Sequence, residues 1–376
     1  MKKLQNFING KSVDSASGET TTLINPSTGQ AFATAPNSNA ADIDKAMKAA
    51  SEAFPIWRDS TPSERQRALL KIADAIEARA QEFVDIESEN CGKPKGLTAS
   101  EEMPPMVDQI RFFAGAARNL EGRSAGEYMK GMTSFIRREP IGVCAQVTPW
   151  NYPMMMAVWK WAPAIAAGNS VVLKPSDTTP ASTLFMAQIM GEFLPDGVIN
   201  VIAGERATGA ALVDHSTPAM VSVTGSVRAG MEVAGAAAKS LKRVHLELGG
   251  KAPVVVFNDA DLQAAAEGIA LAGYFNSGQD CTAATRVIVQ EGVYEEMVKL
   301  LAEQATNHIG MGMPDEDVIV GPVNNASQFE RVNGFVSRTP SHARIVAGGQ
   351  PTNRPGYFVA PTVIADLKQS DELIQS

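Results

Sequence analysis

The chain has 376 residues, and at roughly 150 residues per domain this length predicts two or three folded units. Hydrophobic residues make up 44% and charged residues 20% of the sequence, which is typical of a globular protein and excludes a disordered or fibrous one. The net charge of -8 provides no basic surface for phosphate groups, so we expect neither nucleic acids nor anionic membranes as partners.

The N-terminus and the cysteines indicate the cellular compartment. The opening residues MKKLQNFING lack the apolar stretch of a signal peptide, and no run reaches the ~20 apolar residues of a membrane span. Three widely spaced cysteines, Cys91, Cys144 and Cys281, favour reduced thiols over a disulfide framework. The sequence therefore predicts a cytoplasmic protein in which one thiol is available for chemistry.

Two scaffold helices are predicted after a polar, turn-rich opening. Asn39 precedes apolar residues that recur at helical spacing between Ile43 and Phe54. A second helix is expected to begin at the capping box of residues 61–64, which has proline at the first helical position.

From Ile141 onward, short β-rich runs alternate with helical stretches. The runs are IGVCAQVT, SVVLK, VINVIA, AMVSVT and RVHLEL, separated by helices predicted at 153–167, 180–194 and 227–240. Such alternation is typical of a doubly wound parallel sheet. A second alternating series begins with PVVVF, continues through helices predicted at 261–275 and 293–308, and reaches YFVAPTVI, which predicts another α/β unit.

The segment 122–140 separates the opening helices from the first sheet. Its sequence, GRSAGEYMKGMTSFIRREP, has too many glycines for a helix and is too polar for a core strand, so we expect an exposed hairpin arm. The chain is thus divided into one α/β domain (1–121 and 141–248), the arm (122–140) and a second α/β domain (249–376).

Several familiar motifs match in spacing but not in context. Residues 122–126 fit G-x-S-x-G, yet no buried strand precedes them and no helix follows. Residues 204–209 and 225–230 have the glycine spacing of a P-loop without the Lys-Ser/Thr, and both miss the standard Rossmann fingerprint. Four isolated histidines provide no zinc set. Phosphoryl transfer and metal catalysis are not expected, and a dinucleotide would have to bind in a variant way.

Two residues are candidates for nucleophilic chemistry. Cys281 follows a glycine turn in FNSGQDC, although a single cysteine is more often a small buried apolar residue, and spacing alone favours that role. Glu247 ends an apolar strand beside a double glycine, where burial would raise its pKa toward that of a general base. A strand-end carboxylate that merely caps a turn is the alternative.

Two further strand ends carry polar side chains. Asn151 has Pro149 and Pro153 on either side, which stiffen the backbone and hold the amide in place, although an Asx-turn would also explain it. Lys174 and Asp177 follow the next strand at the carboxyl edge, where doubly wound sheets bind ligands. A surface ion pair is the alternative for these two residues.

The motifs TPWNYP, VLKPS, VTGS, LELGGK and GQDC, in this order, resemble those of the aldehyde dehydrogenase superfamily over nearly the whole chain. ENCGKP, RFFAGAAR and GYFNSGQDCTAATR are similar to the γ-aminobutyraldehyde dehydrogenases in particular. The resemblance implies that the first domain is a variant Rossmann NAD-binding domain, the second is catalytic, and the arm joins a homodimer or homotetramer. The family continues beyond the position of Ser376, so we expect an intact mass above that of this chain.

The resemblance also implies roles for individual residues. Cys281 is the nucleophile, Glu247 the general base, and the Asn151 side chain with the Cys281 N–H forms the oxyanion hole. The residues implied to contact NAD are Thr148, Pro149, Trp150, Lys174, Ser176, Asp177, Gly209, Thr224, Gly225, Ser226 and Leu248. Those implied to surround the aldehyde are Tyr152, Met156, Trp159 and Phe275, for which core packing is the alternative role.

Three acidic residues bear on specificity. Many relatives carry glutamate at the position of Asp177, and either acid would repel a 2′-phosphate, so NAD is expected over NADP. Asp280 would disfavour the neighbouring thiolate unless a cation compensates, and a substrate ammonium is the candidate, with Asp108 as a fainter partner. These residues predict the NAD-dependent oxidation of an ω-aminoaldehyde, such as 4-aminobutanal, through a thiohemiacetal and a thioester.

Two other functions would use the same residues. A cofactor-independent thiol esterase or amidase would employ Cys281 and Glu247, but it leaves VLKPSD and VTGS unexplained. A catalytically silent binding protein on this scaffold is the third alternative, because residues alone do not demonstrate activity.

Overall fold

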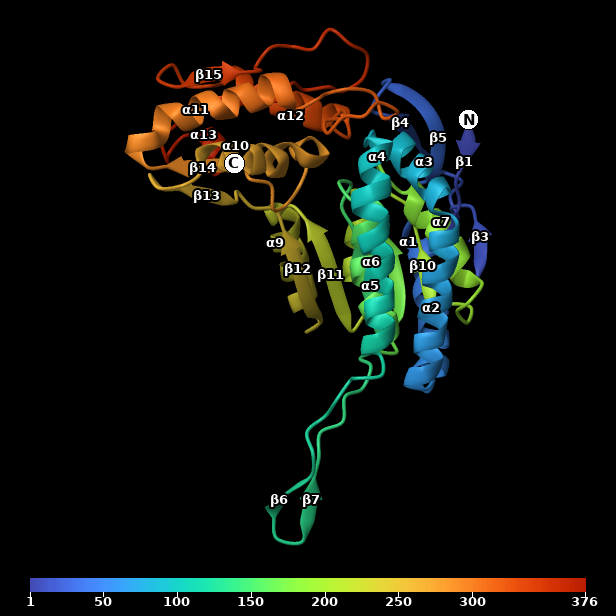
Figure 1. Ribbon diagram of the computed structural model, residues 1–376. Helices are drawn as coiled ribbons and strands as arrows, with labels where there is room; N and C mark the ends of the chain where they lie inside the picture. Colours follow the sequence, from blue (N-terminus) through green and yellow to red (C-terminus); the bar gives the residue numbers. More distant parts are fainter.

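The computed structural model describes all 376 residues, in two lobes from which one hairpin projects (Figure 1). The larger lobe is built on a seven-stranded sheet with the order β12-β11-β8-β9-β10-β2-β3. Its strands are β2 (Asn6–Ile8), β3 (Lys11–Val13), β8 (Val143–Val147), β9 (Ser170–Lys174), β10 (Ile199–Val201), β11 (Met220–Gly225) and β12 (Arg243–Leu248). No helix combines the length and the apolar character needed to cross a membrane.

The direction of chain progression reverses within this sheet. The five strands β8 to β12 are parallel, whereas β2 and β3 are added antiparallel at one edge. From β8 the chain steps to β9 and β10 on one side, and it then returns to place β11 and β12 on the other side of β8. The topological switch point therefore lies between β8 and β11, and in such sheets ligands bind outside the carboxyl ends of the strands at this point.

Helices cover both faces of the sheet. One face carries α6 (Pro153–Ala166) and α7 (Ala181–Gly191), backed by α2 (Pro62–Ala78) and α5 (Met103–Ala116), and the other carries α1 (Ala40–Arg58), α8 (Arg206–Asp214) and α9 (Val227–Ala238). Because side chains alternate along a strand, Val171 and Leu173 enter the first core and Val172 enters the second. The predicted doubly wound α/β fold with a parallel sheet is confirmed.

The first two long helices begin at the predicted caps, whereas the N-terminal strands were not predicted. Capping boxes at Asn39 and Thr61 begin α1 and α2. The opening segment, predicted as turns, also contains β1 (Lys2–Lys3), β4 (Thr20–Asn25) and β5 (Gln30–Pro36), which form a separate sheet. Strands of two or three residues, such as β1 to β3, are too short to show a periodic pattern. Helix α3 (Ala80–Cys91), α4 (Lys95–Leu97) and the π-helix η1 (Thr98–Glu102) lead into α5.

The second lobe contains two small ladders covered by helices. Its strands are β13 (Pro253–Val256), β14 (Arg286–Val289), β15 (Arg344–Ala347) and β16 (Val363–Ala365), with β13 and β14 parallel and β15 and β16 antiparallel. Its helices are α10 (Leu262–Tyr274), the 3₁₀ turn η2 (Phe275–Gly278), η3 (Glu291–Val293), α11 (Tyr294–Glu303), η4 (Gln304–His308), α12 (Ala326–Ser337) and α13 (Glu372–Gln375). The functional division of the chain at residues 248 and 249 stays a prediction.

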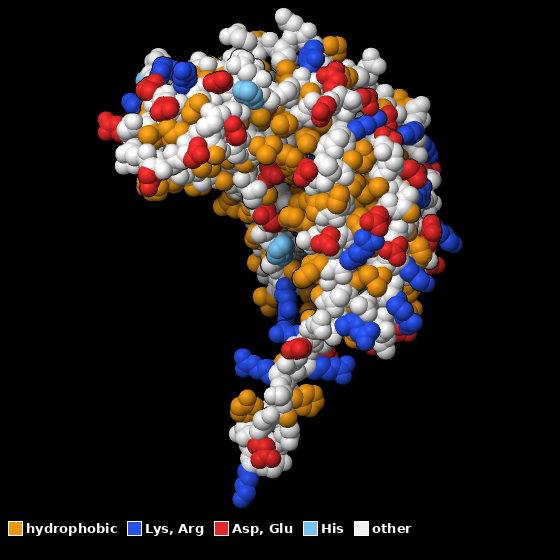
Figure 2. All heavy atoms as spheres, viewed as in Figure 1, with side chains coloured by type: hydrophobic (Ala, Val, Ile, Leu, Met, Phe, Trp, Pro, Cys, Tyr) orange, Lys and Arg blue, Asp and Glu red, His pale blue; other side chains and the backbone are white.

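The segment 122–140 forms the projecting hairpin, with strands β6 (Gly126–Met129) and β7 (Met132–Ser134) (Figure 1). Apolar side chains are exposed on it, and Figure 2 shows them on both sides of the hairpin below the main body. These residues are Tyr128, Met129, Met132, Phe135 and Ile136. The segment is therefore an exposed hairpin, as the sequence predicted.

Candidate active site

The three predicted catalytic residues come from separate parts of the chain and meet where the two lobes join. Asn151 follows β8, Glu247 lies near the end of β12, and Cys281 follows η2 in the second lobe. The Asn151 side-chain amide donates to the Gln279 carbonyl at 2.9 Å. A Cβ placed on Gly250, just after β12, would lie 3.7 Å from the Cys281 carbonyl oxygen. The end of β8 and the end of β12 are thus both close to the cysteine loop.

Cys281 is the only cysteine that is not fully buried. Burial raises its pKa above the ordinary value, and the charges of Glu247 and Asp280 raise it further, so the resting group is the thiol. One Glu247 oxygen, Oε2, is buried and makes no hydrogen bond, which leaves it able to accept a proton. Burial also raises the pKa of Cys144, to about 12, so that thiol is inert.

Two N–H groups beside Cys281 are available to an oxyanion. The Asn151 amide nitrogen carries two hydrogens, and only one is used by the Gln279 carbonyl. The Cys281 backbone N–H donates to no main-chain carbonyl. The arrangement fits the predicted oxyanion hole, in which preorganised donors stabilise developing negative charge.

The turn before Cys281 has an unusual backbone. Asn276, Ser277 and Gly278 all have positive φ, at 49°, 60° and 73°. Left-handed conformations at residues other than glycine cost energy and persist only where surrounding contacts fix them. Here the Asn276 amide donates to the Asn151 carbonyl at 3.0 Å, and the Ser277 hydroxyl donates to the Gly321 carbonyl at 2.9 Å. These bonds fix the cysteine loop against both lobes.

The predicted cofactor residues gather at the carboxyl edge of the sheet, on both sides of the switch point. They are Thr148, Pro149 and Trp150 after β8, Ser176 and Asp177 after β9, Gly209 on α8, Thr224 and Gly225 at the end of β11, Ser226 at the N-cap of α9, and Leu248 at the end of β12. Their contact with a cofactor stays a prediction.

Lys174, the last residue of β9, has a buried ammonium that makes only one of its three possible hydrogen bonds. Its Nζ donates to the Pro175 carbonyl at 2.8 Å, and this is its one hydrogen bond. Burial lowers its pKa to about 8, against the opposing charges of Asp177 and Glu205. The hydroxyl of Thr148 is buried nearby on the same edge without a partner. An anionic, hydroxyl-rich dinucleotide would satisfy both groups, so the residues present fit such a cofactor.

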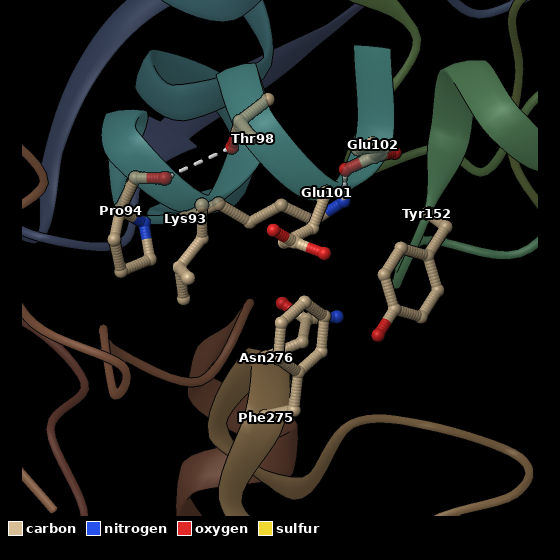
Figure 3. A pocket seen from close by; sticks show the side chains of 9 residues that line it. Lys93, Pro94, Thr98, Glu101, Glu102, Tyr152, Phe275 and Asn276 are labelled. Carbon is tan, nitrogen blue, oxygen red and sulfur yellow. Dashed lines mark hydrogen bonds and ion pairs between the residues drawn. The ribbon is translucent and has the colours of Figure 1, made fainter. Parts of the chain in front are cut away.

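The predicted substrate residues lie on α6 and on the facing turn. Tyr152, Met156 and Trp159 share one face of α6 by their spacing, and Trp159 is the most exposed of the three, at 45%. Tyr152 and Phe275 line one pocket, together with Lys93, Glu101 and Glu102 (Figure 3). The lining of an aldehyde tunnel by these residues stays a prediction.

Asp280 is held by hydrogen-bond donors, whereas the sequence suggested that a cation was needed. Its Oδ2 accepts from the Tyr152 hydroxyl at 2.8 Å, and its Oδ1 accepts from the Thr282 N–H and Oγ1 at 2.7 Å each. Burial raises the pKa of Asp280, and these hydrogen bonds outweigh it, so the pKa lies below its usual value. The carboxylate is therefore charged and already partly satisfied.

Lys160 is a candidate that the sequence analysis missed. It lies on α6, is 5% exposed, and its Nζ donates to the Ser222 hydroxyl at 3.0 Å. Burial lowers its pKa to about 8, and the Glu247 carboxylate opposes this shift. A single lysine within the apolar helix PMMMAVWKWAPAIA was the signal that could have identified it.

Comparisons with known proteins agree with this geometry. The family model described as "Aldehyde dehydrogenase family" matches residues 12–376. Betaine aldehyde dehydrogenase of Cereibacter sphaeroides is 39% identical over 364 residues, which cover 96% of this chain and 75% of that protein.

Solved structures extend the likeness to the fold. The NAD-dependent aldehyde dehydrogenase of Sinorhizobium meliloti matches with a TM-score of 0.96 and 37% identity, over 99% of this chain and 75% of the other. The aldehyde dehydrogenase of Bacillus cereus, solved as its NAD⁺ complex, matches with a TM-score of 0.95 and 35% identity, over 99% and 77% of the two chains. This chain belongs to the aldehyde dehydrogenase family.

Proposed function

We propose that this protein oxidises an aldehyde to a carboxylic acid, with Cys281 as nucleophile and NAD as hydride acceptor. The observation that carries the proposal is the convergence of three groups at the junction of the lobes. They are a partly exposed thiol, a buried carboxylate oxygen of Glu247 with no partner, and an Asn151 amide with one N–H to spare. This is the combination of nucleophile, base and oxyanion donor that covalent catalysis requires.

The residues act in sequence. Glu247 takes the Cys281 proton, directly or through water, and the sulfur attacks the carbonyl carbon, which gives a thiohemiacetal oxyanion held by the Asn151 amide and the Cys281 N–H. NAD, when bound, supplies the acceptor for the hydride that leaves this carbon. Glu247 passes the proton it took from Cys281 to solvent and can then remove a proton from the water that cleaves the thioester. The departing Cys281 sulfur takes up this second proton, which releases the acid and restores the thiol.

The edge of the sheet around the switch point is the proposed NAD site. Thr148 offers a buried hydroxyl without a partner within the protein, and Lys174 offers a buried ammonium with a single hydrogen bond. The Asp177 carboxylate lies on the same edge, accepts from the Ser176 hydroxyl at 3.1 Å, and would repel a 2′-phosphate. The complex of the Bacillus cereus relative with NAD⁺ supports the same cofactor here.

We further propose a cationic substrate, an ω-aminoaldehyde such as 4-aminobutanal. Charged Asp280 adjoins the nucleophile, and the exposed Glu101 lines the pocket that also contains the rings of Tyr152 and Phe275, whereas Glu102 is already paired with Lys93. Carboxylates and aromatic faces both attract an ammonium group. The similarity to a betaine aldehyde dehydrogenase, named for an aldehyde that carries a quaternary ammonium, supports a cation of this kind.

We also infer a cytoplasmic homodimer or homotetramer joined through the hairpin arm. The exposed apolar side chains of segment 122–140 support this assembly, because a monomer would leave them in water.

Two substitutions test the catalytic assignment. Cys281→Ser abolishes NADH formation from an aldehyde while NAD binding persists, and Glu247→Gln gives one burst of NADH and then stalls because the thioester is not hydrolysed. The measurement is NADH absorbance in stopped flow, with Cys144→Ala as a matched control that keeps full turnover. Steady turnover in either active-site variant would contradict the assignment. Ester hydrolysis without NAD, and no NADH from any aldehyde, would favour the cofactor-independent thiol esterase.

A charge-removing substitution tests the substrate proposal. Asp280→Asn keeps the shape and one acceptor but removes the charge, so the preference for 4-aminobutanal over butanal, as a ratio of kcat/KM, falls about tenfold, equivalent to ~1.4 kcal/mol. Asp108→Asn is the control: the sequence suggested Asp108 as a fainter partner of the cation, but its side chain is exposed on α5 and, unlike Asp280, does not adjoin Cys281. Betaine aldehyde, assayed in parallel, distinguishes a quaternary from a primary ammonium. An unchanged ratio in Asp280→Asn rejects Asp280 as the cation partner.

A further inference from the structure

A buried cluster of three charged side chains, two of which line the pocket, has no role in the proposed reaction steps. Lys93, just after α3, is 6% exposed, and its Nζ lies 2.5 Å from Glu102 Oε2 and 3.4 Å from Glu87 Oε1. Glu87 is itself fully buried and accepts from the Ser182 hydroxyl at 2.5 Å. Burying one cation with two carboxylates is costly, and apolar side chains of the same volume are often as stable or more so. The cluster is therefore poorly explained by stability alone.

The Lys93 ammonium also contacts an aromatic ring of the candidate active site. Its Nζ lies 4.3 Å from the centroid of the Tyr152 ring, within the range of a cation–π interaction (Figure 3). Because the two carboxylates fix the ammonium and Tyr152 is 9% exposed, the ring is confined to one position. The orientation of the Tyr152 hydroxyl thus depends on Lys93.

The Tyr152 hydroxyl extends the network to the nucleophile. It donates to Asp280 Oδ2 at 2.8 Å, and the other oxygen of Asp280 accepts from Thr282. Asp280 and Thr282 are the residues on either side of Cys281. A continuous series of contacts therefore runs from Glu102 through Lys93, Tyr152 and Asp280 to the cysteine loop.

The consequence for Cys281 follows from the acceptor capacity of Asp280. Burial of the thiol and the negative charge of the adjacent Asp280 both favour the protonated cysteine. Each donor that already occupies the carboxylate weakens it as an acceptor for the thiol. If the Tyr152 hydroxyl were lost, Asp280 would bind the thiol proton more strongly, and the reactive thiolate would become scarcer.

We propose that Lys93 is a positioning residue for the nucleophile: it fixes the Tyr152 ring so that its hydroxyl occupies Asp280 and leaves the Cys281 thiol free to ionise. The consequence for turnover rests on the proposed dehydrogenase function. The effect on the thiol does not, because it can be measured without an aldehyde or NAD.

The test is the rate at which iodoacetamide alkylates Cys281, followed by mass spectrometry of the peptide. The variants are Tyr152→Phe, which removes only the hydroxyl, and Lys93→Gln/Glu102→Gln, which replaces the ion pair with two amides. Each variant alkylates about tenfold more slowly, equivalent to one unit in the thiol pKa. The triple variant is no slower than Tyr152→Phe, because Lys93 acts through that hydroxyl.

Controls separate positioning from general destabilisation. Arg79→Gln breaks a similar interaction, 4.4 Å from the Phe185 ring and paired with Glu82, but away from the cysteine, and its alkylation rate stays that of the wild type. Lys93→Gln alone is avoided because it strands two buried carboxylates. If the variant Lys93→Gln/Glu102→Gln fails to fold, Glu102→Gln alone replaces it. Combined with Tyr152→Phe, it is again expected to be alkylated no more slowly than Tyr152→Phe alone.

Two results would overturn the proposal. One is unchanged alkylation in folded variants of Lys93 or Glu102, and the other is a triple variant whose rate falls by the product of the separate effects. If a variant forms NADH at the normal rate but is alkylated slowly, Lys93 affects the Cys281 thiol but not catalysis. Slow alkylation in a protein without any NADH formation would keep Lys93 as a positioning residue and reject the proposed function instead.

Discussion

Lys160 illustrates how a single residue can cost stability and still be retained. Its ammonium is buried among the apolar residues of α6, where one hydrogen bond, to Ser222, replaces its hydration. Burial lowers the pKa to about 8 in the folded chain, whereas the unfolded value is 10.5. Because the Glu247 carboxylate opposes that shift, the lysine is electrostatically coupled to the proposed general base.

This pKa gives a pH prediction with a definite sign. Below about pH 8 lysine is protonated in both states and the folded state bears the full cost, whereas between about pH 8 and 10.5 the unfolded state binds more protons, so stability rises with pH. The free energy of unfolding of the wild type, minus that of Lys160→Met, therefore increases by about 1 kcal/mol from roughly pH 7 to pH 9. Urea titrations across this range measure it. Lys48→Met, at an exposed position of α1, is the control, and a flat result for Lys160 would reject its buried charge.

At the residue scale, the sequence identified which residues carry the chemistry, but not which hydrogen-bond partners surround them. Cys281 alone was more easily explained as a buried apolar residue, and only the ordered motifs around Asn151, Lys174 and Glu247 favoured a nucleophile. Asp280 was expected to need a cation, yet Tyr152 and Thr282 donate to it. Tyr152 is 128 positions away from Asp280 in the chain, so no local pattern could reveal the contact.

At the element scale, predictability followed the apolar pattern and the capping of each segment. Helices α1 and α2 begin at capping boxes, and the parallel strands β8 to β12 are β-rich runs bounded by turns. The sequence predicted a glycine turn before Cys281 but not its left-handed backbone, because Asn276 and Ser277 are fixed by bonds to Asn151 and Gly321. Its conformation is a tertiary property and has no sequence period.

The hairpin arm supports a prediction at the same scale. Tyr128→Ser/Phe135→Ser removes two large apolar side chains, 80% and 69% exposed, that we propose to be covered by another copy of the chain. The expected result is a smaller assembly by analytical ultracentrifugation, with unchanged circular dichroism because the arm adds nothing to either core. Glu127→Gln, on the same strand, serves as the control. An unchanged sedimentation coefficient in the double variant would show that the arm does not join subunits.

At the scale of the whole molecule, the reversal of strand order creates the site. The switch point between β8 and β11 opens the carboxyl edge, and the second lobe delivers Cys281 to that edge. Because the proposed cofactor contacts come from strands β8, β9, β11 and β12, NAD is expected to bind only the folded sheet and to stabilise it.

Cofactor choice follows as a further prediction. NAD at about 100 times its Kd adds roughly 2.7 kcal/mol to the free energy of unfolding, whereas NADP at the same concentration adds less because Asp177 repels the 2′-phosphate. Asp177→Asn reduces the difference between the stabilisation by NAD and that by NADP. Thermal unfolding in the presence of each nucleotide measures this difference. Asp108→Asn, at an exposed position of α5, is the control and leaves the difference between NAD and NADP unchanged. Equal stabilisation of the wild type by NAD and NADP would reject the role of Asp177.

The sequence alone determined the fold class, the order of the parallel strands along the chain and the residue types of the candidate site. The reason is that hydrophobic periodicity, helix caps and motifs depend on residues that are close together in the chain. Only the tertiary structure decided which distant groups meet. The Asn151 amide bonds to Gln279, Lys93 lies against Tyr152, and Lys160 is buried near Glu247. Such contacts depend on how sheets and loops pack, and burial and charge then set the pKa of each group.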